Sequence, residues 1–286
     1  MRARRPVVIP DEDRKTLEEV ARDHVAVVLQ ACRYNRTVTA RVLGIDRKTL
    51  AEYIRRWSIA VPTDPAPQRL QPGSLVVVEG LDGSGISTQA RRLVDYLTEH
   101  DHPAVLTAEP SSGPVGQVLR RLLQSPTNLP YADPMRTLSL LFAADRLDHF
   151  HRIVEPAMAA GTTVVSERWY HSSLAYQRSS IDRDWILAVH RHTRAPDVTI
   201  YLDVPPELGL ARRTAAGRRR EFFHDAETQR AAADGYRATI AELRADGERV
   251  DVVDGQQPIE QVAATILLAL GLGKRAAPAA TTRSDP

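Results

Sequence analysis

The chain has 286 residues, of which 43% are hydrophobic and 26% charged, a composition typical of globular domains rather than of disordered or fibrous chains. No apolar run reaches the ~18 residues that a membrane-spanning helix requires, and the basic N-terminus lacks the apolar core of a secretion signal, so we expect a cytoplasmic protein without a membrane partner. The single cysteine, Cys32, excludes an internal disulfide framework and argues against a thiolate metal site.

Charge is distributed unevenly along the chain, although the formal net charge is only +2. Residues 1–72 contain 14 Lys and Arg against 9 Asp and Glu, a net charge of about +5, whereas the remainder has 24 against 27, about −3. This asymmetry indicates a small basic module, suited to nucleic acid, in front of a mildly acidic body. A solvated charged helix would give the same counts, so charge alone does not decide between the two.

The basic front module has the pattern of three short helices, within VAVVLQACRYNRTVTARVLGIDRKTLAEYIRRW (25–57). Its apolar residues have the spacing of a three-helix core: Ala40, Leu43, Ile45, Leu50 and Ile54. Gly44 stands where a tight turn between two helices requires a positive φ. The sequence therefore predicts a small all-helical domain over residues 1–60.

This module resembles the Fis-type helix-turn-helix. The matching residues are Asn35-Arg36, Ala40, Leu43-Gly44-Ile45, Arg47 and Thr49-Leu50. The resemblance implies that the helix from Asp46 to Trp57 enters the DNA major groove, with Arg47, Lys48 and Thr49 near its N-terminus as the DNA contacts. It also implies a homodimer. The alternative is a three-helix appendage that only dimerises.

A linker and a tail flank the body of the chain. Residues 61–74 hold four prolines and no helical or strand periodicity, which predicts a linker. Residues 272–286 are small and polar and are predicted to be disordered. The body then comprises residues 75–271.

Strand and helix patterns alternate through this body. Short apolar runs predict strands at 75–79, 104–108, 162–167, 198–204 and 249–254. Helical patterns fall at 87–101, 114–124, 133–160, 182–193, 205–214, 225–246 and 257–270. The alternation predicts an α/β fold with a parallel sheet covered by helices on both faces, and ligands at the carboxyl ends of the strands.

The stretch GLDGSGIST (80–88) follows the first predicted strand and is close to the phosphate-loop pattern G-x-x-x-x-G-K-[ST]. A glycine-rich turn that opens a helix presents backbone N–H groups to an anion, so we expect Gly80, Gly83, Ser84, Gly85, Ile86, Ser87 and Thr88 to bind phosphates. The Ser87 hydroxyl is a candidate Mg²⁺ ligand. Ile86 stands where the pattern requires lysine, so the loop is one charge short.

The loop and the chain that follows it resemble the thymidylate kinases, a family of P-loop nucleoside monophosphate kinases. The resemblance extends over nearly all of residues 74–271. It is carried by VVVEGLDGSGISTQA at the loop, EPSSGPVG (109–116), LLFAADR (140–146), SERWYHSSLAYQ (166–177), PDVTIYLDVPPELGLARR (196–213) and VDGQQPIEQV (253–262). Paired glycines usual in the second segment are serines here.

The resemblance implies a phosphoryl transfer from ATP to dTMP or a related deoxynucleotide, with Mg²⁺. Asp82 would meet the acceptor sugar or a metal-bound water, and Arg168 would bridge the donor and acceptor phosphates. Glu167 replaces the family's usual aspartate as a metal ligand beside Ser87. The basic stretch RRTAAGRRR (212–220) is a candidate lid, in which Arg218 and Arg219 are candidate catalytic cations.

The same resemblance places the acceptor nucleotide. Phe142 would stack on the base, and Arg146 would hydrogen-bond to the base edge. The remaining contacts to base and deoxyribose are Ser173, Tyr176 and Gln177. Tyr176 would crowd a ribose 2′-hydroxyl, which implies a preference for deoxynucleotides.

Two functions from different classes remain open. The acceptor-site residues, Arg168 and the lid arginines favour a dTMP kinase fused to a DNA-binding module, with a rate that Ile86 is expected to reduce. The fused helix-turn-helix and Ile86 itself favour an inactive, nucleotide-sensing transcription regulator. An unrelated P-loop ATPase would leave the nucleobase segments unexplained.

Overall fold

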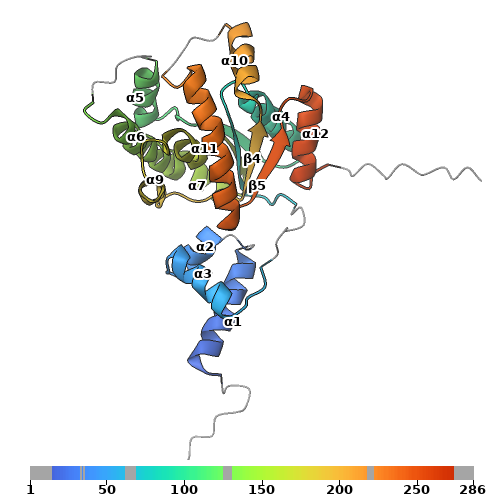
Figure 1. Ribbon diagram of the computed structural model, residues 1–286. Helices are drawn as coiled ribbons and strands as arrows, with labels where there is room; N and C mark the ends of the chain where they lie inside the picture. Colours follow the sequence, from blue (N-terminus) through green and yellow to red (C-terminus); the bar gives the residue numbers. More distant parts are fainter. Residues whose placement is uncertain are drawn as a thin grey trace, which may run out of the picture. The chain divides into compact units, whose positions relative to one another are not determined.

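The computed structural model describes residues 15–32, 34, 36–61, 69–124, 131–217 and 222–273, apart from the side chains of residues 37, 38 and 41 (Figure 1). The chain divides into two compact units, residues 1–64 and 65–286, and each is described by itself.

The first unit contains three helices, as the sequence predicts: α1 (Leu17–Ala31), α2 (Arg36–Val42) and α3 (Arg47–Arg56). Asp46 caps α3, because its carboxylate accepts a hydrogen bond of 2.9 Å from the backbone N–H of Thr49. Gly44 turns the chain between α2 and α3 with φ +67°. The core contains Val25, Ala40 and Leu50, with Leu43, Ile45 and Ile54 packed against it.

The second unit is built on five parallel strands in the order β2-β3-β1-β4-β5. Their bounds are β1 (Leu75–Gly80), β2 (Ala104–Ala108), β3 (Thr163–Glu167), β4 (Val198–Asp203) and β5 (Val250–Asp254). The central strand β1 pairs with β3 on one side and β4 on the other, so that Val77 is opposite Ser166 and Thr199. The predicted parallel sheet and all five of its strands are confirmed.

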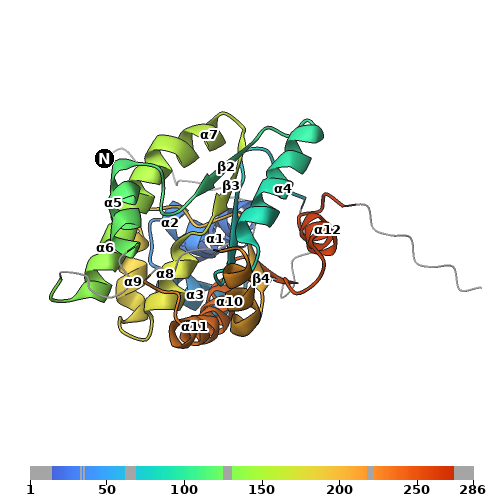
Figure 2. The same cartoon turned by 90° about the horizontal axis from the view of Figure 1, so that it is seen from above.

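Helices cover both faces of this sheet (Figure 2). Their bounds are α4 (Ile86–Glu99), α5 (Pro114–Leu123), α6 (Pro134–His149), α7 (Glu155–Ala159), α8 (Tyr170–Gln177), α9 (Arg183–His190), α10 (Pro206–Ala215), α11 (Ala226–Ala245) and α12 (Ile259–Ala269). Helices α4 and α12 pack on one face, and α6, α8, α9 and α11 lie on the other.

Strand β1 shows how the sequence fills both layers. Every residue of β1 is buried, and its side chains alternate between the two faces. Val76 and Val78 pack with α4 and α12, whereas Leu75 and Val77 pack with the opposite layer. A strand buried on both faces therefore reads as a continuous apolar run.

Two helical features differ from the sequence expectation. Residues 133–160 form α6, a π-helical turn at Phe150–Val154 and then α7, rather than one regular helix. Pro156 has no N–H, and its ring excludes the regular bond to the carbonyl four residues back, which accounts for the widened turn. Helix α8 was not predicted, because it is buried on most sides and has no amphipathic period.

The expected linker and tail partly join the second unit. Leu70, within the 61–74 stretch, is 7% exposed and its N–H donates to the carbonyl of Leu270 at 2.9 Å. Residues 69–74 thus pack against the α/β unit, while residues 62–68 lie outside the described residues. Of the expected tail, Leu272 packs on the core, and residues 274–286 also lie outside the described residues.

Close packing of α11 on α8 gives a stability prediction. A Cβ at Gly235 would lie 2.1 Å from the carbonyl oxygen of Ala175, so Gly235→Ala forces the two helices apart. We expect the free energy of unfolding to fall by about 1–3 kcal/mol, measured by urea denaturation. The neighbouring Asp234→Ala, on an exposed side chain, should change it by less than about 0.5 kcal/mol. An unchanged Gly235→Ala variant would contradict the close contact.

Candidate active site

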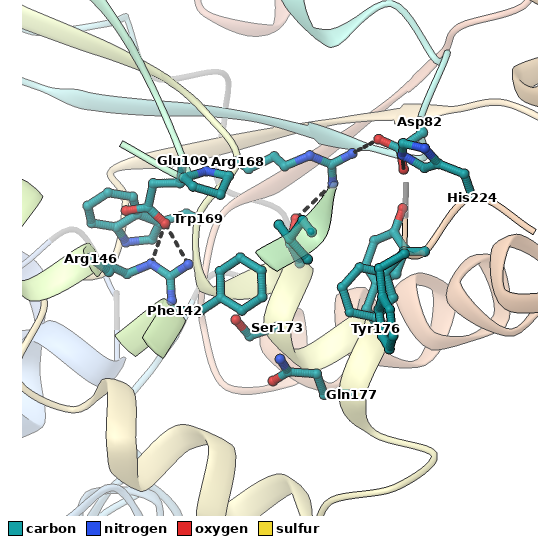
Figure 3. Close-up of a pocket in the computed structure, with 15 residues that line it drawn as sticks. Asp82, Glu109, Phe142, Arg146, Arg168, Trp169, Ser173, Tyr176, Gln177 and His224 are labelled. Carbon is teal, nitrogen blue, oxygen red and sulfur yellow. Dashed lines mark hydrogen bonds and ion pairs between the residues drawn. The ribbon is translucent and has the colours of Figure 1, made fainter. Parts of the chain in front are cut away.

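A pocket opens at the carboxyl ends of β1 and β3, as expected for a parallel α/β sheet. It contains about 680 Å³ of space between protein atoms, part of it open to solvent. The structure brings these sequence-predicted residues together around it: Asp82, Phe142, Arg146, Arg168, Ser173, Tyr176 and Gln177 (Figure 3).

An ion pair stands at one end of the pocket. Arg168 follows β3 and donates from Nη2 to Oδ1 of Asp82, in the loop after β1, at 2.6 Å. Burial would raise the pKa of the Asp82 carboxyl, but the charge of Arg168 and the hydrogen bond from His224 hold this pKa below its ordinary value. Asp82 therefore stays ionised, and this end of the pocket carries fixed charges of both signs.

The Arg168 guanidinium is held by several further contacts. Its Nη1 donates to Oγ of Ser172 at 3.0 Å, to the hydroxyl of Tyr236 at 3.2 Å and to the carbonyl of Gly80 at 3.2 Å. The backbone of Arg168 has φ +72°, a conformation that non-glycine residues rarely adopt. Such strain persists where the surroundings fix it, and it is concentrated at functional sites.

Beneath Arg168 lies a buried carboxylate, that of Glu79 on β1. It is 1% exposed and accepts hydrogen bonds from the backbone N–H of Trp169 at 2.8 Å and from the hydroxyls of Ser172 and Tyr236 at 2.8 and 2.7 Å. Burial, and then the charge of Glu79, raise the pKa of the Tyr236 hydroxyl, so this tyrosine remains a proton donor. Glu79 thereby fixes the turn after β3 to α8 and α11.

The opposite end of the pocket combines one flat apolar side chain, Phe142, with polar side chains around it. The Phe142 ring, on α6, lies between Arg146 and the pair Ser173 and Gln177 on α8 (Figure 3). Gln177 is 1% exposed, and its Oε1 has no hydrogen-bond partner among the described residues. A buried amide oxygen without a partner costs free energy, so this acceptor is suited to a ligand donor.

Arg146 is engaged by the protein itself. Its Nε donates to the Glu109 carboxylate at 2.7 Å, its Nη1 donates to Nδ1 of His190 at 2.9 Å, and the guanidinium lies over the Trp169 ring at 5.4 Å. Burial, and then the charge of Arg146, lower the pKa of His190 to about 2, so this imidazole is a neutral acceptor. Since both terminal nitrogens of a guanidinium carry two N–H groups, Arg146 retains donors for a ligand.

The phosphate loop has the backbone shape that its glycines predict. Gly80, Gly83 and Gly85 have φ values of +157°, +83° and +102°, and helix α4 begins directly after Gly85. Ile86 is 8% exposed and its side chain packs in the core beneath the sheet with Val76 and Ala90. The loop therefore offers α4's N-terminal amides to an anion, while Ile86 contributes apolar packing and no charge.

Two hard oxygen ligands meet next to this loop. Ser87, in the first turn of α4, donates its hydroxyl hydrogen to the Glu167 carboxylate at the end of β3. A hydroxyl and a carboxylate side by side fit Mg²⁺, which takes few protein ligands and completes its shell with water and phosphate oxygens. Within the described residues no cluster of three or more His, Cys, Asp or Glu side chains suits a metal.

Comparison with known proteins agrees with this geometry. Residues 78–266 match the family model of thymidylate kinase. The chain belongs to the thymidylate kinase family. Within the first unit, residues 16–57 match the family model of bacterial regulatory proteins of the Fis family, so the predicted helix-turn-helix is confirmed.

Several thymidylate kinases are similar to this chain over almost their whole length. That of Dinoroseobacter shibae is 38% identical over 213 residues, covering 69% of this chain and 96% of that protein. That of Desulfosudis oleivorans is 35% identical over 213 residues, covering 68% and 95%. The probable thymidylate kinase of Thermococcus gammatolerans is 32% identical over 195 residues, covering 66% and 92%.

The segment that follows the candidate lid supplies site residues that sequence reasoning missed. Phe222, Phe223 and His224 line the pocket, and His224 contacts Oδ2 of Asp82 at 3.1 Å. Their run, EFFHD, has no amphipathic period and no phosphate-binding pattern, so only the contact reveals them. The candidate lid cations Arg218 and Arg219 lie outside the described residues.

Other pocket residues were also missed. Glu109, Trp169 and Ser172 line the pocket beside residues that were predicted. Each of the three lies within a segment that carries the family resemblance, next to a residue that was predicted. That position in the sequence was the signal that could have identified them. Among the phosphate-loop candidates, Ser84 is buried and Thr88 exposed.

On the helix-turn-helix, the three candidate DNA contacts differ in their surroundings. Lys48 is exposed, Arg47 is half-buried, and the Thr49 hydroxyl donates to the capping carboxylate of Asp46 at 2.6 Å. Lys48 and Arg55 share one side of α3, where a shallow depression lies. In the part of the chain that the structure describes, no helix is long and apolar enough to span a bilayer.

Arg146 gives a stability prediction for the second unit. In Arg146→Met the Glu109 carboxylate, 3% exposed, loses its guanidinium partner, and we expect the free energy of unfolding to fall by about 3–5 kcal/mol in urea denaturation. Arg136→Met, on the same helix with an exposed ion pair to Asp133, should cost less than about 1 kcal/mol.

Adding Glu109→Gln to Arg146→Met should restore part of the lost stability, because the unpaired charge is then removed. Equal stability of Arg146→Met and Arg136→Met would contradict the buried pairing.

Proposed function

We propose that the second unit transfers the γ-phosphoryl group of ATP to the 5′-phosphate of dTMP, giving dTDP. The observation that carries this proposal is one pocket with Arg168 and Asp82 at one end and Phe142, Arg146 and Gln177 at the other. Membership of the thymidylate kinase family and similarity to proteins of that name support it.

The base end favours thymine through its hydrogen-bond pattern. The Arg146 guanidinium can donate to a carbonyl oxygen such as O4, and the Gln177 amide oxygen can accept from a ring N–H such as N3–H. Cytosine presents an amino group and an unprotonated nitrogen at these places, so it would leave both protein groups unpaired. Phe142 provides the flat surface on which the ring stacks.

Tyr176 faces the sugar in this arrangement. Its hydroxyl accepts a hydrogen bond from Gln229 at 3.4 Å, and its ring contacts Phe223, with the ring centres 5.4 Å apart. A side chain fixed in this way cannot withdraw from an added 2′-hydroxyl, which favours deoxynucleotides.

At the phosphate end the protein acts by position and charge. Arg168 is a bidentate cation held in place, suited to the acceptor phosphate and to the group in transfer. The α4 N-terminus cradles the donor phosphates, and Ser87 with Glu167 would hold Mg²⁺, which neutralises phosphate charge during transfer. Arg218 and Arg219 are proposed as further cations.

We propose that the first unit binds DNA, with Arg47, Lys48 and Thr49 of α3 at the major groove and a homodimer as the binding species. The match to the Fis family supports this. The alternative to the kinase, a regulator that senses a nucleotide without turnover, uses the same two units and is favoured by Ile86.

Turnover and base choice test the first proposal. The purified chain with ATP, Mg²⁺ and dTMP should form ADP and dTDP, with a kcat/KM at least about 100-fold above that for dCMP. Gln177→Leu should lower kcat/KM for dTMP about 10–100-fold, because one buried hydrogen bond is lost.

The matched control is Gln117→Leu, on the exposed face of α5, which should leave both substrates unaffected. Absence of dTDP above background would contradict the kinase and leave the sensor. Equal kcat/KM values for dTMP and dCMP would contradict the proposed selectivity for thymine.

DNA binding is tested by salt titration on duplex DNA of mixed sequence. Lys48→Ala should weaken binding and lower the slope of log K against log salt by up to about one, since one cation is removed from the DNA-facing end of α3. Arg22→Ala, an exposed residue of α1 paired with Asp23, should leave the slope unchanged. A Lys48→Ala slope equal to that of the unmodified chain would argue against α3 as the DNA-facing helix.

A further inference from the structure

The phosphate loop lacks the cation that its sequence pattern requires. A lysine at position 86 would bring a positive charge to the β- and γ-phosphates, whereas Ile86 packs into the core. If the unit transfers phosphoryl groups, another cation must lie near the loop.

Helix α10 packs directly on the phosphate loop. A Cβ at Gly83 would lie 2.2 Å from the carbonyl oxygen of Gly209, and a Cβ at Gly209 would lie 2.6 Å from the carbonyl oxygen of Asp82. Two glycines thus bring the backbones of α10 and the loop into contact. Arg213 is four residues after Gly209, one turn further along the same face of the helix.

Arg213 is joined to the loop through His224. Its Nη2 lies 2.8 Å from Nδ1 of His224, and Nε2 of His224 lies 3.1 Å from Oδ2 of Asp82. The other oxygen of Asp82 receives Arg168. A row of four side chains, Arg168–Asp82–His224–Arg213, therefore runs from the acceptor pocket to α10.

The hydrogen bonds define the tautomer of His224. A guanidinium has no acceptor, so Arg213 must donate to Nδ1. Nδ1 then carries no hydrogen, and Nε2 carries it and donates to the Asp82 carboxylate. His224 thus connects a cation to an anion.

The end of α10 also contacts the segment between β5 and α12. Arg212 donates to the carbonyl of Gly255, in the segment between β5 and α12, at 3.0 Å. Neighbouring residues of α10 thus contact the acceptor pocket through His224 and the β5–α12 segment through Arg212.

We propose that Arg213 contacts the phosphates of the bound ATP and supplies the positive charge that Ile86 does not, and that His224 positions it. This rests on the proposed kinase function. Asp82 joins His224 to Arg168, which follows β3, so the row holds Arg213 at a fixed place relative to the acceptor pocket.

The test uses Arg213→Met in the full-length chain, with the exposed Arg237→Met on α11 as control. We expect kcat to fall at least about 100-fold, on the scale of an arginine that stabilises a phosphoryl transition state, with KM for dTMP changed less than about 3-fold. Affinity for an analogue that joins adenosine and thymidine through a pentaphosphate should fall at least about 10-fold, while dTMP affinity should not change.

His224→Ala should lower kcat by about 10-fold or more, and should add little to Arg213→Met, because both changes remove one unit. In the Arg213→Met background, Ile86→Lys should restore at least about 10-fold in kcat, but it should not rescue Arg168→Met. Thermal denaturation checks that variants with Ile86→Lys still fold, because position 86 is buried. The analogue-binding measurement on Arg213→Met does not depend on the Ile86→Lys variant.

Arg213→Met within about 3-fold of the unmodified chain in both turnover and analogue affinity would overturn the proposal. If the unmodified chain makes no dTDP, the kinase proposal fails separately, and the loss of analogue affinity in Arg213→Met still decides the role of Arg213.

Discussion

The buried carboxylate of Glu79 is the anchor on which the phosphate end of the site depends. An anion taken out of water costs several kcal/mol unless its hydrogen-bonding capacity is filled. Glu79 is filled by the turn after β3 through Trp169, by α8 through Ser172 and by α11 through Tyr236. These elements cannot shift separately without exposing or orphaning that charge. Arg168 donates hydrogen bonds to Ser172 and Tyr236, which also bind Glu79, so Glu79 indirectly fixes the position of Arg168.

A second buried carboxylate, Glu109, fixes the base end in the same way. It binds Arg146, and Arg146 in turn binds His190 on α9, while His149 on α6 lies 3.2 Å from the other oxygen of Glu109. The pocket is thus bounded by two buried charge clusters. Breaking either would leave an uncompensated ion, so the separation of phosphate end from base end is set before any ligand arrives. Such preorganisation is what positioning catalysis requires.

The sequence predicts the fold better than it predicts the site contacts. Strands such as β1 are apolar along their whole length because both faces are covered, and this signal is local. Helix α8 was not predicted because it is buried on most sides and so has no amphipathic period. The π-helical turn before Pro156 was not predicted because it depends on the geometry of the proline ring. His224 was missed for another reason. Its partner Asp82 is 142 residues away and its partner Arg213 is 11 residues away, beyond the candidate lid, so no local pattern marks it.

Ile86 separates two properties that a lysine combines, the shape of the loop and its charge. The shape is retained, because Gly83 and Gly85 keep positive φ and α10 closes on the loop at Gly209. Binding of a nucleotide needs that shape in a kinase and in a sensor alike. Arg168 would serve both functions, because a guanidinium suited to the acceptor phosphate also holds the phosphate of a nucleotide that is sensed and not turned over. Its φ of +72°, a strain of about 1–3 kcal/mol, is of the kind that is concentrated at functional sites. What separates transfer from sensing is a cation at the donor phosphates, which Ile86 does not supply.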